Sequence, residues 1–305
     1  MPEPRYVWFN GELVRWEEAK IHVATHALHY GTGVFEGIRA YKTVKGVPAI
    51  FRLKEHIERF FNSAKLYRFE IPFSAEEIAE ACKLVVKENG LDDAYIRPLA
   101  YLKVTEIGVK PKSREAGVVV FAIRWGRYLG EAYEKGANCL VSVWRRLPPF
   151  SFPTVAKACG HYINSYLAAI DAMEGGYDEA IMLDHRGFVS EGTGENIFMV
   201  KGGKVYTTPL EASILPGITR DTVIKLCRDL GLEVVEKDIT LGELLTADEA
   251  FFTGTAAEVT PIARINGIAV GDGKPGPVTR KLQQLYSDVV RGKVRKYEGW
   301  LTYVE

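Results

Sequence analysis

The sequence predicts an α/β protein of the α+β type with two domains. Its 305 residues exceed the length of most single cores. Segments rich in β-branched and aromatic residues alternate with segments of helical spacing, and clear periodicity is lost at residues 121–134. We therefore predict a small N-terminal domain at 1–120, a linker at 121–134 and a large C-terminal domain at 135–305, with the active site in the cleft between the domains.

The first domain begins with a hairpin. Asn10-Gly11 separates two apolar runs and suits a type I′ turn, because both central residues of that turn need a positive φ. Apolar residues recur at helical spacing from Leu53, which predicts a helix. Residues 94–104 and 117–123 are rich in β-branched and aromatic side chains and predict two strands.

Two capping boxes mark helix starts. Ser74 with Glu77 begins a helix that Gly90 ends, and Thr240 with Glu243 begins another. The second domain alternates helices and strands: a strand at 139–143, a helix ending at Gly175-Gly176, strands around Ile181 and Phe198, a helix at 220–230, a strand at Val234, an Asn266-Gly267 turn and a last helix at 278–290.

Composition narrows the function. Thirty-nine basic residues balance 39 acidic ones, so neither nucleic acid nor a membrane is expected as a partner. The four cysteines are far apart and form no Cys-x-x-Cys pair, which argues against a zinc knuckle or disulfide framework and favours a reducing cytoplasm. No Gly-x-Gly-x-x-Gly follows a first strand, so a nicotinamide dehydrogenase is disfavoured.

Four features are candidates for chemistry, each with a plainer alternative. Leu215–Asp221 (LPGITRD) places Thr219 as a candidate N-cap and offers an anion site, or is only a cap. Gly254–Glu258 (GTAAE) brings backbone amides near a ligand, or is a tight turn. Ser190–Asn196 (SEGTGEN) supplies a carboxylate, or is a polar loop. Lys157 lies in a sparsely charged stretch that favours imine chemistry, or is a solvated surface lysine.

Three histidines, His22, His26 and His29, have a spacing that imitates metal ligands. No cysteine or carboxylate nearby completes such a site, so we expect packed or hydrogen-bonded histidines and no metal. Trp125 and Tyr128, taken alone, are more typical of core or interface aromatics than of substrate contacts.

Read together, several segments carry a resemblance. HALHYGTGVFEGIRAY (26–41), AYIRPL (94–99), AKACGHY (156–162), SEGTGEN, LPGITRD and GTAAE come in the order found in the branched-chain aminotransferases. The sequence resembles that family nearly end to end. The resemblance implies a two-domain fold-type IV enzyme, D-amino acid aminotransferase-like, with pyridoxal 5'-phosphate as its cofactor.

The resemblance also implies residue roles around the cofactor. Lys157, in the large domain, is expected to hold the cofactor covalently and to move the proton during catalysis. Glu191 is expected to face the pyridine nitrogen and Tyr162 the ring hydroxyl. The phosphate is expected to be bound by a guanidinium together with backbone and hydroxyl donors. These donors are Arg59, Leu215, Gly217, Ile218, Thr219 and Thr255.

Substrate residues follow from the same resemblance. Tyr95 and the backbone at Thr255 and Ala256 are expected to hold the α-carboxylate. An aromatic box is expected to pack the Val, Leu or Ile side chain, while Arg97 binds the distal carboxylate of glutamate. The box consists of Tyr30, Phe35, Trp125 and Tyr128. Tyr30 or the Ile107–Val109 loop is expected to come from a neighbouring subunit, so that a dimer, or a trimer of such dimers, is the active form.

The implied reaction is ping-pong transamination. An L-branched-chain amino acid gives its amino group to the cofactor, and 2-oxoglutarate takes it to become glutamate. D-amino acid aminotransferases and aminodeoxychorismate lyases share this fold and stay open as alternatives, although the EGIRAY and YIRPL arginines favour the branched-chain type. A cofactor-binding protein without turnover is disfavoured by the presence of both Lys157 and Glu191. Cys159 and His161 depart from the family pattern, which bears on substrate preference rather than reaction type.

Overall fold

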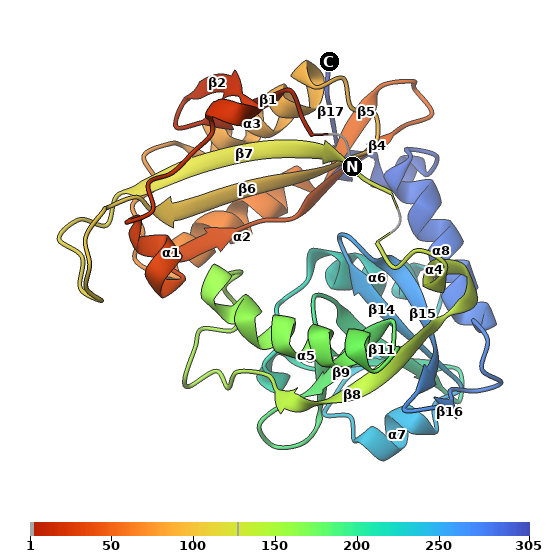
Figure 1. The fold of residues 1–305 in the computed structure, drawn as a ribbon. Coiled ribbons are helices and arrows are strands. Elements are labelled where there is room, and N and C mark those ends of the chain that lie inside the picture. Colours follow the sequence, from red (N-terminus) through yellow and green to blue (C-terminus); the bar gives the residue numbers. More distant parts are fainter. Residues whose placement is uncertain (1–2, 127) are drawn as a thin grey trace. The chain divides into compact units, whose positions relative to one another are not determined.

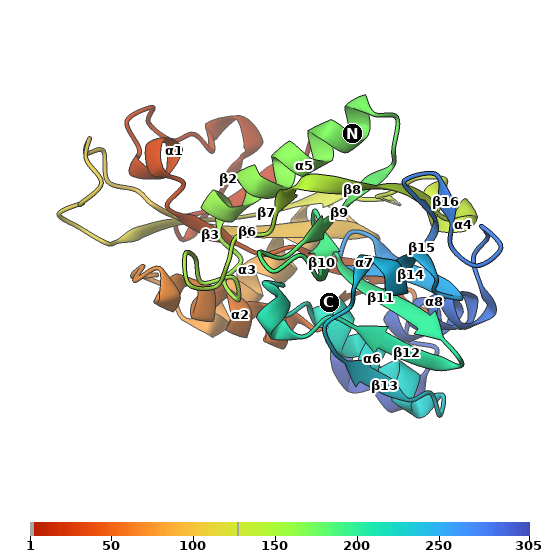
Figure 2. The same ribbon diagram turned by 90° about the horizontal axis from the view of Figure 1, so that it is seen from below.

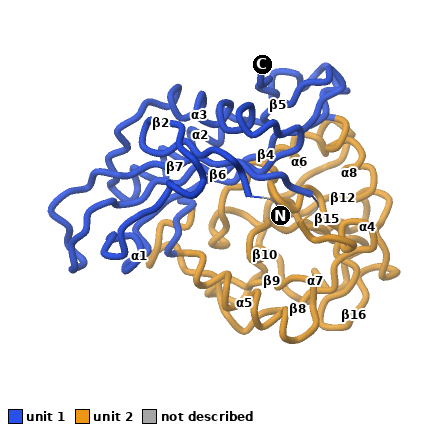
Figure 3. The backbone as a smooth tube through the Cα atoms, turned by 45° about the horizontal axis from the view of Figure 1, so that its top comes forward, with its two compact units in different colours: residues 1–126, 156–160, 289–305 blue, residues 127–155, 161–288 orange. Residues whose placement is uncertain are grey.

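A computed structural model of the chain describes residues 3–126 and 128–305. Its backbone contacts separate two units, coloured differently in Figure 3. Unit 1 comprises residues 1–126, 156–160 and 289–305, and unit 2 comprises residues 127–155 and 161–288. Each unit has its own sheet, and the two sheets differ in kind.

This division differs from the predicted domain boundaries in three places. Residues 121–124, placed in the predicted linker, continue a long strand, as the strand predicted at 117–123 indicates. The Lys157 segment, 156–160, belongs to unit 1 because Phe35 N donates to Lys157 O (3.0 Å) and Val34 forms a β-bridge with Ala158. Residues 289–305 also belong to unit 1, since a strand near the C-terminus pairs with its sheet. Such pairings between distant segments leave no local signal in the sequence.

Unit 1 is built around an antiparallel sheet. Its elements are β1 (Tyr6–Phe9), β2 (Glu12–Arg15), the 3-10 turn η1 (Trp16–Glu18), α1 (His26–Tyr30), β3 (Gly33–Phe35), β4 (Ile38–Lys42), β5 (Pro48–Phe51), α2 (Leu53–Leu66), α3 (Ala75–Glu88), β6 (Ala94–Leu102), β7 (Ala116–Arg124), η4 (Arg295–Trp300) and β17 (Leu301–Tyr303). The strand order is β17-β5-β4-β6-β7-β1-β2, and β3 pairs with β6. Helices α2 and α3 lie side by side along this sheet (Figures 1 and 2).

The core of unit 1 lies between those two helices and the sheet. Ile57 and Phe60 of α2 and Ile78 of α3 are fully or almost fully buried with the inward side chains of β6 and β7. The predicted period-3.6 pattern from Leu53 is therefore confirmed, because it places one apolar face of α2 against the sheet. Ser74 accepts from Glu77 N and Glu77 bonds back to Ser74 N, so the predicted capping box of α3 is also confirmed.

Unit 2 carries a mixed sheet. Its elements are α4 (Ala132–Lys135), β8 (Ala137–Arg145), α5 (Tyr162–Glu174), β9 (Glu179–Leu183), β10 (Val189–Gly192), β11 (Asn196–Lys201), β12 (Lys204–Thr207), η3 (Leu210–Ala212), α6 (Ile218–Asp229), β13 (Val234–Glu236), α7 (Leu241–Leu245), β14 (Glu249–Gly254), β15 (Glu258–Ile265), β16 (Ile268–Ala269) and α8 (Pro277–Val290), with η2 (Cys159–His161) at its border. Helix α5 runs along β8 and β9 (Figures 1 and 2).

The strands of unit 2 form a closed ring. They are paired in the order β10-β9-β8-β15-β14-β11, and β10 also pairs with β11 through Glu191 and Asn196. The predicted strands around Ile181 and Phe198 are confirmed as β9 and β11, and the capping box at Thr240 and Glu243 begins α7 as predicted. Ring closure leaves the ends of several strands at one rim, where loops can place polar side chains.

Two turns confirm the Asn-Gly signals. Asn10 and Gly11 have φ of 51° and 102° between β1 and β2, and Asn266 and Gly267 have φ of 49° and 78° between β15 and β16. Both pairs supply the positive φ that a type I′ turn requires. Among the helices of the described ranges, none combines the length and the apolar character needed to cross a membrane.

Candidate active site

Lys157 is held by its backbone in unit 1. Its N–H donates to Ser63 Oγ of α2 (3.0 Å), and its carbonyl accepts from Phe35 N at the end of β3 (3.0 Å). Ser63 Oγ in turn donates to Arg59 O within α2 (2.8 Å). The side chain is half-buried, with Nζ 4.9 Å from the centre of the Phe35 ring. These two bonds fix the backbone from which the Lys157 side chain extends.

Side chains predicted for the substrate pocket form a series of contacts that begins at Phe35, the ring beside that amine. The Arg97 guanidinium lies 4.5 Å from the Phe35 ring centre, and its Nη2 donates to the Tyr95 hydroxyl (2.9 Å). The Tyr95 ring meets the Trp125 ring at 4.8 Å and 34°. The structure thus brings Lys157, Phe35, Arg97, Tyr95 and Trp125 into one cluster of unit 1. Aromatic faces beside a cation combine apolar packing with a hydrogen-bond donor.

Gly37 makes this cluster possible. A Cβ at Gly37 would lie 2.1 Å from the Tyr95 hydroxyl oxygen, so any side chain there would displace Tyr95. The motif EGIRAY contains this glycine, but sequence reasoning gave it no role. A glycine directly before a strand, as Gly37 is before β4, is a signal that another group approaches the backbone closely.

A buried charge cluster joins Glu36, just after β3, to His56 and Arg59 on α2, the helix that carries Ser63. Glu36 is completely buried; its Oε1 accepts from Arg59 Nε (2.7 Å) and its Oε2 from Arg59 Nη2 (2.9 Å). His56 Nδ1 is 2.7 Å from Glu36 Oε2. Burial alone raises the pKa of Glu36, but the Arg59 charge and the bonds from His56 and Arg59 outweigh it and hold that pKa well below its ordinary value. Glu36 is therefore a carboxylate at neutral pH.

Tyr30 lies at a different part of unit 1. Its hydroxyl accepts from Gly108 N (2.9 Å), and its ring lies 4.5 Å from that of His26, whose Nε2 bonds Gly108 O. Together these residues hold the loop whose exposed tips are Ile107 and Val109, with 74% and 80% of their surface accessible. Tyr30 and this loop, named above as alternative contributions from a neighbouring subunit, are thus in contact within one chain.

In unit 2, Glu191 on β10 is buried and bound on both oxygens. Oε1 forms an ion pair with Arg146 Nη2 (2.9 Å), and Oε2 accepts from Asn196 Nδ2 (3.0 Å) and from Leu215 N (3.2 Å). Ser190–Gly192 belong to a strand, so the alternative of a polar loop is wrong for this part of SEGTGEN. Sequence reasoning missed Arg146, whose partner lies in a distant segment, and gave no role to Asn196, although it stands five residues after Glu191 in SEGTGEN.

Asn196 also fixes the segment before α6. Its Nδ2 donates to Leu215 O (2.9 Å), and a Cβ at Gly217 would lie 2.0 Å from its Oδ1. The N-cap of α6 is Gly217, and the helix begins at Ile218; the expectation that Thr219 is the N-cap is wrong. The helix begins two residues earlier than predicted, directly after the extended backbone of Gly217. The buried Thr219 lies within that turn, where N–H groups point out of the helix end.

The remaining predicted residues of unit 2 lie at element ends. Thr255 and Ala256 form the tight turn between β14 and β15, where Gly254 pairs with Glu258. Tyr162 is the first residue of α5 and is half-buried. Tyr128 is 49% exposed and follows the one undescribed residue between the two described ranges.

The three spaced histidines each bond to nearby groups. His26 bonds Thr32 Oγ1 and Gly108 O, His29 bonds Val23 O, and His22 Nδ1 accepts from Ala24 N. Among the described residues, no group of three His, Cys, Asp or Glu side chains has a metal-binding arrangement.

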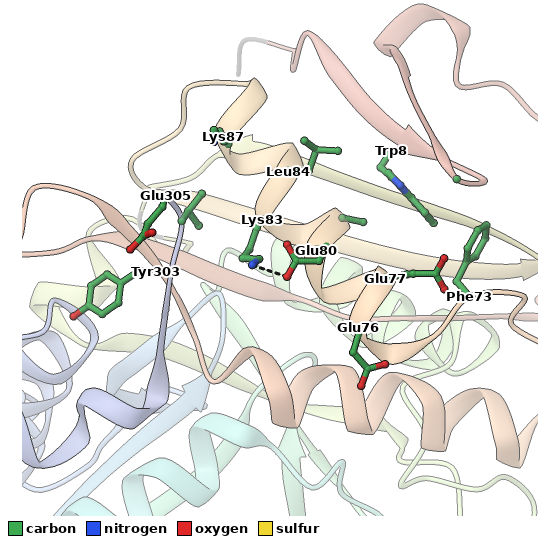
Figure 4. Close-up of a pocket in the computed structure, with 13 residues that line it drawn as sticks. Trp8, Phe73, Glu76, Glu77, Glu80, Lys83, Leu84, Lys87, Tyr303 and Glu305 are labelled. Carbon is green, nitrogen blue, oxygen red and sulfur yellow. Dashed lines mark ion pairs between the residues drawn. The ribbon is translucent and has the colours of Figure 1, made fainter.

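Another cavity of unit 1 is separate from the candidate site. A surface pocket of about 600 Å³ lies along α3, with the rings of Trp8 and Phe73 meeting edge to face at 4.8 Å and an ion pair between Lys83 and Glu80 on its rim (Figure 4). None of the predicted site residues lines it. Its lining mixes glutamates and lysines with apolar side chains.

Comparison with known proteins assigns the family. The family model described as amino-transferase class IV matches residues 33–265, which include Lys157 and Glu191. The chain belongs to the class IV aminotransferases. This class IV aminotransferase is 49% identical to the branched-chain-amino-acid aminotransferase of Escherichia coli strain K12 over 301 residues, which cover 98% of this chain and 97% of the relative. The resemblance found in its sequence is confirmed.

Solved structures agree with the family and the fold. The crystal structure of an Escherichia coli branched-chain amino acid aminotransferase matches with a TM-score of 0.97 and 48% identity over 99% of this chain and 100% of the other. The branched-chain aminotransferase of the archaeon Thermoproteus uzoniensis, solved with norvaline, matches with a TM-score of 0.95 and 47% identity over 99% of this chain and 100% of the other. A third relative, solved in complex with N-(5'-phosphopyridoxyl)-L-glutamate, has a TM-score of 0.95 and 48% identity over the full length of both chains. The predicted fold class is confirmed.

Proposed function

We propose that this class IV aminotransferase transfers amino groups between L-branched-chain amino acids and 2-oxoglutarate, with pyridoxal 5'-phosphate as cofactor. Leucine, isoleucine and valine yield branched-chain 2-oxo acids, and 2-oxoglutarate yields L-glutamate, in a ping-pong sequence. The observation that carries this proposal is the cluster of Lys157, Phe35, Arg97, Tyr95 and Trp125, which places an amine and a guanidinium beside the same aromatic ring. The near full-length relatives at 49% identity support the same substrates.

The residues present fit the cofactor. An aldehyde needs a held amine, a pyridine ring nitrogen needs a buried carboxylate, and a phosphate needs a guanidinium and helix-start amides. Lys157, Glu191, Arg59 and the Gly217 start of α6 supply this donor set. Bound pyridoxal phosphate supplies an electron-accepting ring that makes the proton on the substrate Cα removable.

Each protein group has a part in that chemistry. Lys157 Nζ holds the cofactor and carries the proton to and from the substrate Cα. Glu191, kept in place by Arg146, Asn196 and Leu215 N, holds the proton on the ring nitrogen. Tyr162 donates to the ring hydroxyl. Arg59, the turn at Thr255, and Leu215, Gly217, Ile218 and Thr219 at the start of α6 bind the phosphate.

One pocket serves two kinds of substrate. The faces of Phe35 and Trp125, with Tyr128, pack an aliphatic side chain and exclude water from it. Arg97 binds the distal carboxylate of glutamate, and its bond to the Tyr95 hydroxyl already fixes its direction. Tyr95 and the backbone at Thr255 and Ala256 hold the α-carboxylate.

The active form in this proposal is a homodimer, with a trimer of dimers as the larger assembly, and sedimentation of the purified chain measures which forms. Tyr30 and the Ile107–Val109 loop complete the pocket of a neighbouring subunit; their fixed geometry and the high exposure of Ile107 and Val109 support this. The enzyme works in the cytoplasm, which suits its four free cysteines.

The test is a product assay on purified protein. With L-leucine and 2-oxoglutarate we expect 4-methyl-2-oxopentanoate and glutamate, and a change in the cofactor spectrum on adding leucine alone. D-Alanine with 2-oxoglutarate should give no pyruvate above background. Pyruvate from D-alanine without product from leucine would assign the D-specific activity instead, and an unchanged spectrum with every amino acid would remove transamination altogether.

A further inference from the structure

The charge cluster of Glu36, His56 and Arg59 has a geometry that goes beyond a simple ion pair. Arg59 meets Glu36 through Nε and Nη2, the side edge of its guanidinium, with bonds of 2.7 and 2.9 Å to different carboxylate oxygens. Two parallel bonds fix the plane of the guanidinium as well as its position. The opposite edge, which carries Nη1, is by this geometry turned away from Glu36.

Glu36 itself is unable to swing. It lies between Phe35 and Gly37 at the end of β3, and Gly37 N also contacts its Oε2 (3.3 Å). His56 contacts the same oxygen from α2 at 2.7 Å, and because an ionised carboxylate only accepts, Nδ1 carries the hydrogen. Both oxygens are therefore occupied by donors, all of them buried or nearly so.

His56 joins the cluster as a neutral donor. It is 2% exposed, and burial lowers its pKa, with Glu36 acting in the opposite direction and the charges of Arg59 and Lys157 adding to the lowering. The groups that face it are thus Glu36, Arg59 and Lys157. A neutral imidazole secures the carboxylate without adding a second cation that would compete with Arg59 for it.

We propose that Glu36 and His56 are positioning residues that lock the Arg59 guanidinium in the orientation in which it binds the cofactor phosphate. This inference rests on the proposed function, in which Arg59 is one of the phosphate ligands. Arg59 is 12% exposed at its side chain while Glu36 is not exposed at all, so the carboxylate orients Arg59 from behind and has no surface of its own for a ligand.

Two opposite effects of Glu36 on phosphate binding are conceivable, and geometry favours one. A carboxylate beside Arg59 reduces the net positive charge seen by a phosphate, which would weaken binding. It also prevents a long flexible side chain from sampling other rotamers, which strengthens binding by pre-organisation. Because Glu36 uses both oxygens on the edge opposite Nη1, orientation is the effect we assign to it.

The experiment compares two ligands that differ only in the phosphate. Dissociation constants of pyridoxal 5'-phosphate and of pyridoxal are measured by absorbance and protein fluorescence on the full chain stripped of cofactor. The affinity for the first divided by that for the second reports the phosphate contribution alone. Glu36→Gln should reduce this ratio about tenfold, with pyridoxal binding changed less than about twofold. A ratio that is unchanged or higher in Glu36→Gln overturns the proposal.

Glu55→Gln is the matched control. Glu55 accepts from Arg52 Nε (2.7 Å) one turn earlier on α2, so its loss removes a glutamate–arginine pair from the same helix without touching Glu36. We expect the wild-type ratio for it. An equal loss in both variants would assign the effect to α2 as a whole and overturn the positioning role.

Arg59→Gln separates this inference from the proposed function. If Arg59→Gln leaves the ratio at the wild-type value, Arg59 does not bind the phosphate, and its role in the proposed function fails together with the inference. If Arg59→Gln lowers the ratio and Glu36→Gln does not, only the inference fails.

His56 gives a second, independent route should Glu36→Gln fold poorly. Asn at position 56 can place an amide N–H near the Nδ1 position, whereas Leu fills the space without a donor. His56→Asn should keep the ratio within about twofold, and His56→Leu should lower it several-fold. Equal ratios for the two variants would contradict a positioning role for His56.

Discussion

Two buried carboxylates, Glu36 in unit 1 and Glu191 in unit 2, are satisfied in different ways. The side-chain donors of Glu36, His56 and Arg59, stand three residues apart on one face of α2. The donors of Glu191 come from three separate segments: Arg146 after β8, Asn196 on β11 and the backbone of Leu215. The side-chain donors of Glu36 are thus all in place once α2 docks on the sheet. Those of Glu191 come together only when the strands of unit 2 have closed into a ring.

The difference extends to charge. Glu36 has a guanidinium on both oxygens and a strongly lowered pKa, so it is committed to the carboxylate form. Glu191 has its ion pair with Arg146 on Oε1, while Oε2 accepts from the neutral donors of Asn196 and Leu215. A carboxylate with one oxygen on neutral donors is better suited to share a proton with a ligand, and one bound by a cation on both oxygens is better suited to orient that cation.

The largest effect should come from the amine that unit 1 contributes. Lys157→Ala removes the group that holds the cofactor and moves the proton, so kcat for leucine should fall by about 10⁴-fold or more. The assay is steady-state transamination, with the visible spectrum followed in parallel. Lys42→Ala is the control, because Lys42 is an exposed lysine of the same unit that pairs with Asp92. Normal turnover of Lys157→Ala would end the proposed mechanism.

Substitution of Arg146 tests how strongly stability depends on the ion pair of Glu191, the buried carboxylate of unit 2. Arg146→Met removes the guanidinium that pairs with the buried Glu191, and removing one partner of a buried pair costs about 3–5 kcal/mol. Denaturant unfolding of the cofactor-free chain should show this loss. In Glu191→Gln the same Arg146 substitution should cost less, since no buried charge is then left without its partner. Equal costs in the two backgrounds would show that the Arg146–Glu191 pair has no coupling.

Whether the sequence predicted a feature of the fold or of the site depends on whether neighbouring residues or distant segments determine it. The capping boxes at Ser74 and Thr240 and the Asn10-Gly11 turn are confirmed, because a few neighbouring residues determine them. Lys157 and Glu191 were found through the resemblance, but Glu36 and Arg146 were not. Glu36 lies 20 residues before His56, and only the folded sheet brings them together.

The errors have the same origin. Thr219 was expected as the N-cap of α6 because a hydroxyl after Pro-Gly is a typical cap, yet Gly217 takes that place. Asn196 requires glycine at that position, since its Oδ1 occupies the place that a Cβ at 217 would need. Residues 121–124 were assigned to a linker because clear periodicity is lost over residues 121–134, while their actual partner is β6, earlier in the sequence.

Acidification should weaken the unit 1 cluster in two steps. The pKa of His56 is lowered from its ordinary 6.5, so the unfolded chain takes up a proton before the folded one, and stability falls as the pH drops below 6.5. Glu36 has a pKa lowered from 4.5, so its contribution is complete above 4.5 and is lost as the pH falls below that value towards its folded pKa. Each group adds a slope of at most about 1.4 kcal/mol per pH unit.

Unfolding free energies between about pH 7 and pH 4 would measure those slopes. His56→Asn should flatten the region just below pH 6.5, because Asn does not titrate there, and should leave the region below 4.5 dependent on Glu36. An unaltered slope below pH 6.5 in His56→Asn would mean that the pKa of His56 is the same in the folded and the unfolded chain, and would contradict the lowering by burial.

The smallest predicted effect comes from two helix caps, one in each unit, that lie outside the charge clusters of Glu36 and Glu191. Ser74 caps α3 of unit 1 and Thr240 caps α7 of unit 2, each through a side-chain bond to the N–H three residues on. Replacing either by Ala should cost about 1 kcal/mol. If each unit unfolds by itself, Ser74→Ala should lower the midpoint of one transition and Thr240→Ala that of another; if they unfold together, both shift a single transition. Because the caps lie outside the charge clusters of Glu36 and Glu191, phosphate binding and turnover should stay at wild-type levels, and a change in either would mean that helix stability is coupled to the site.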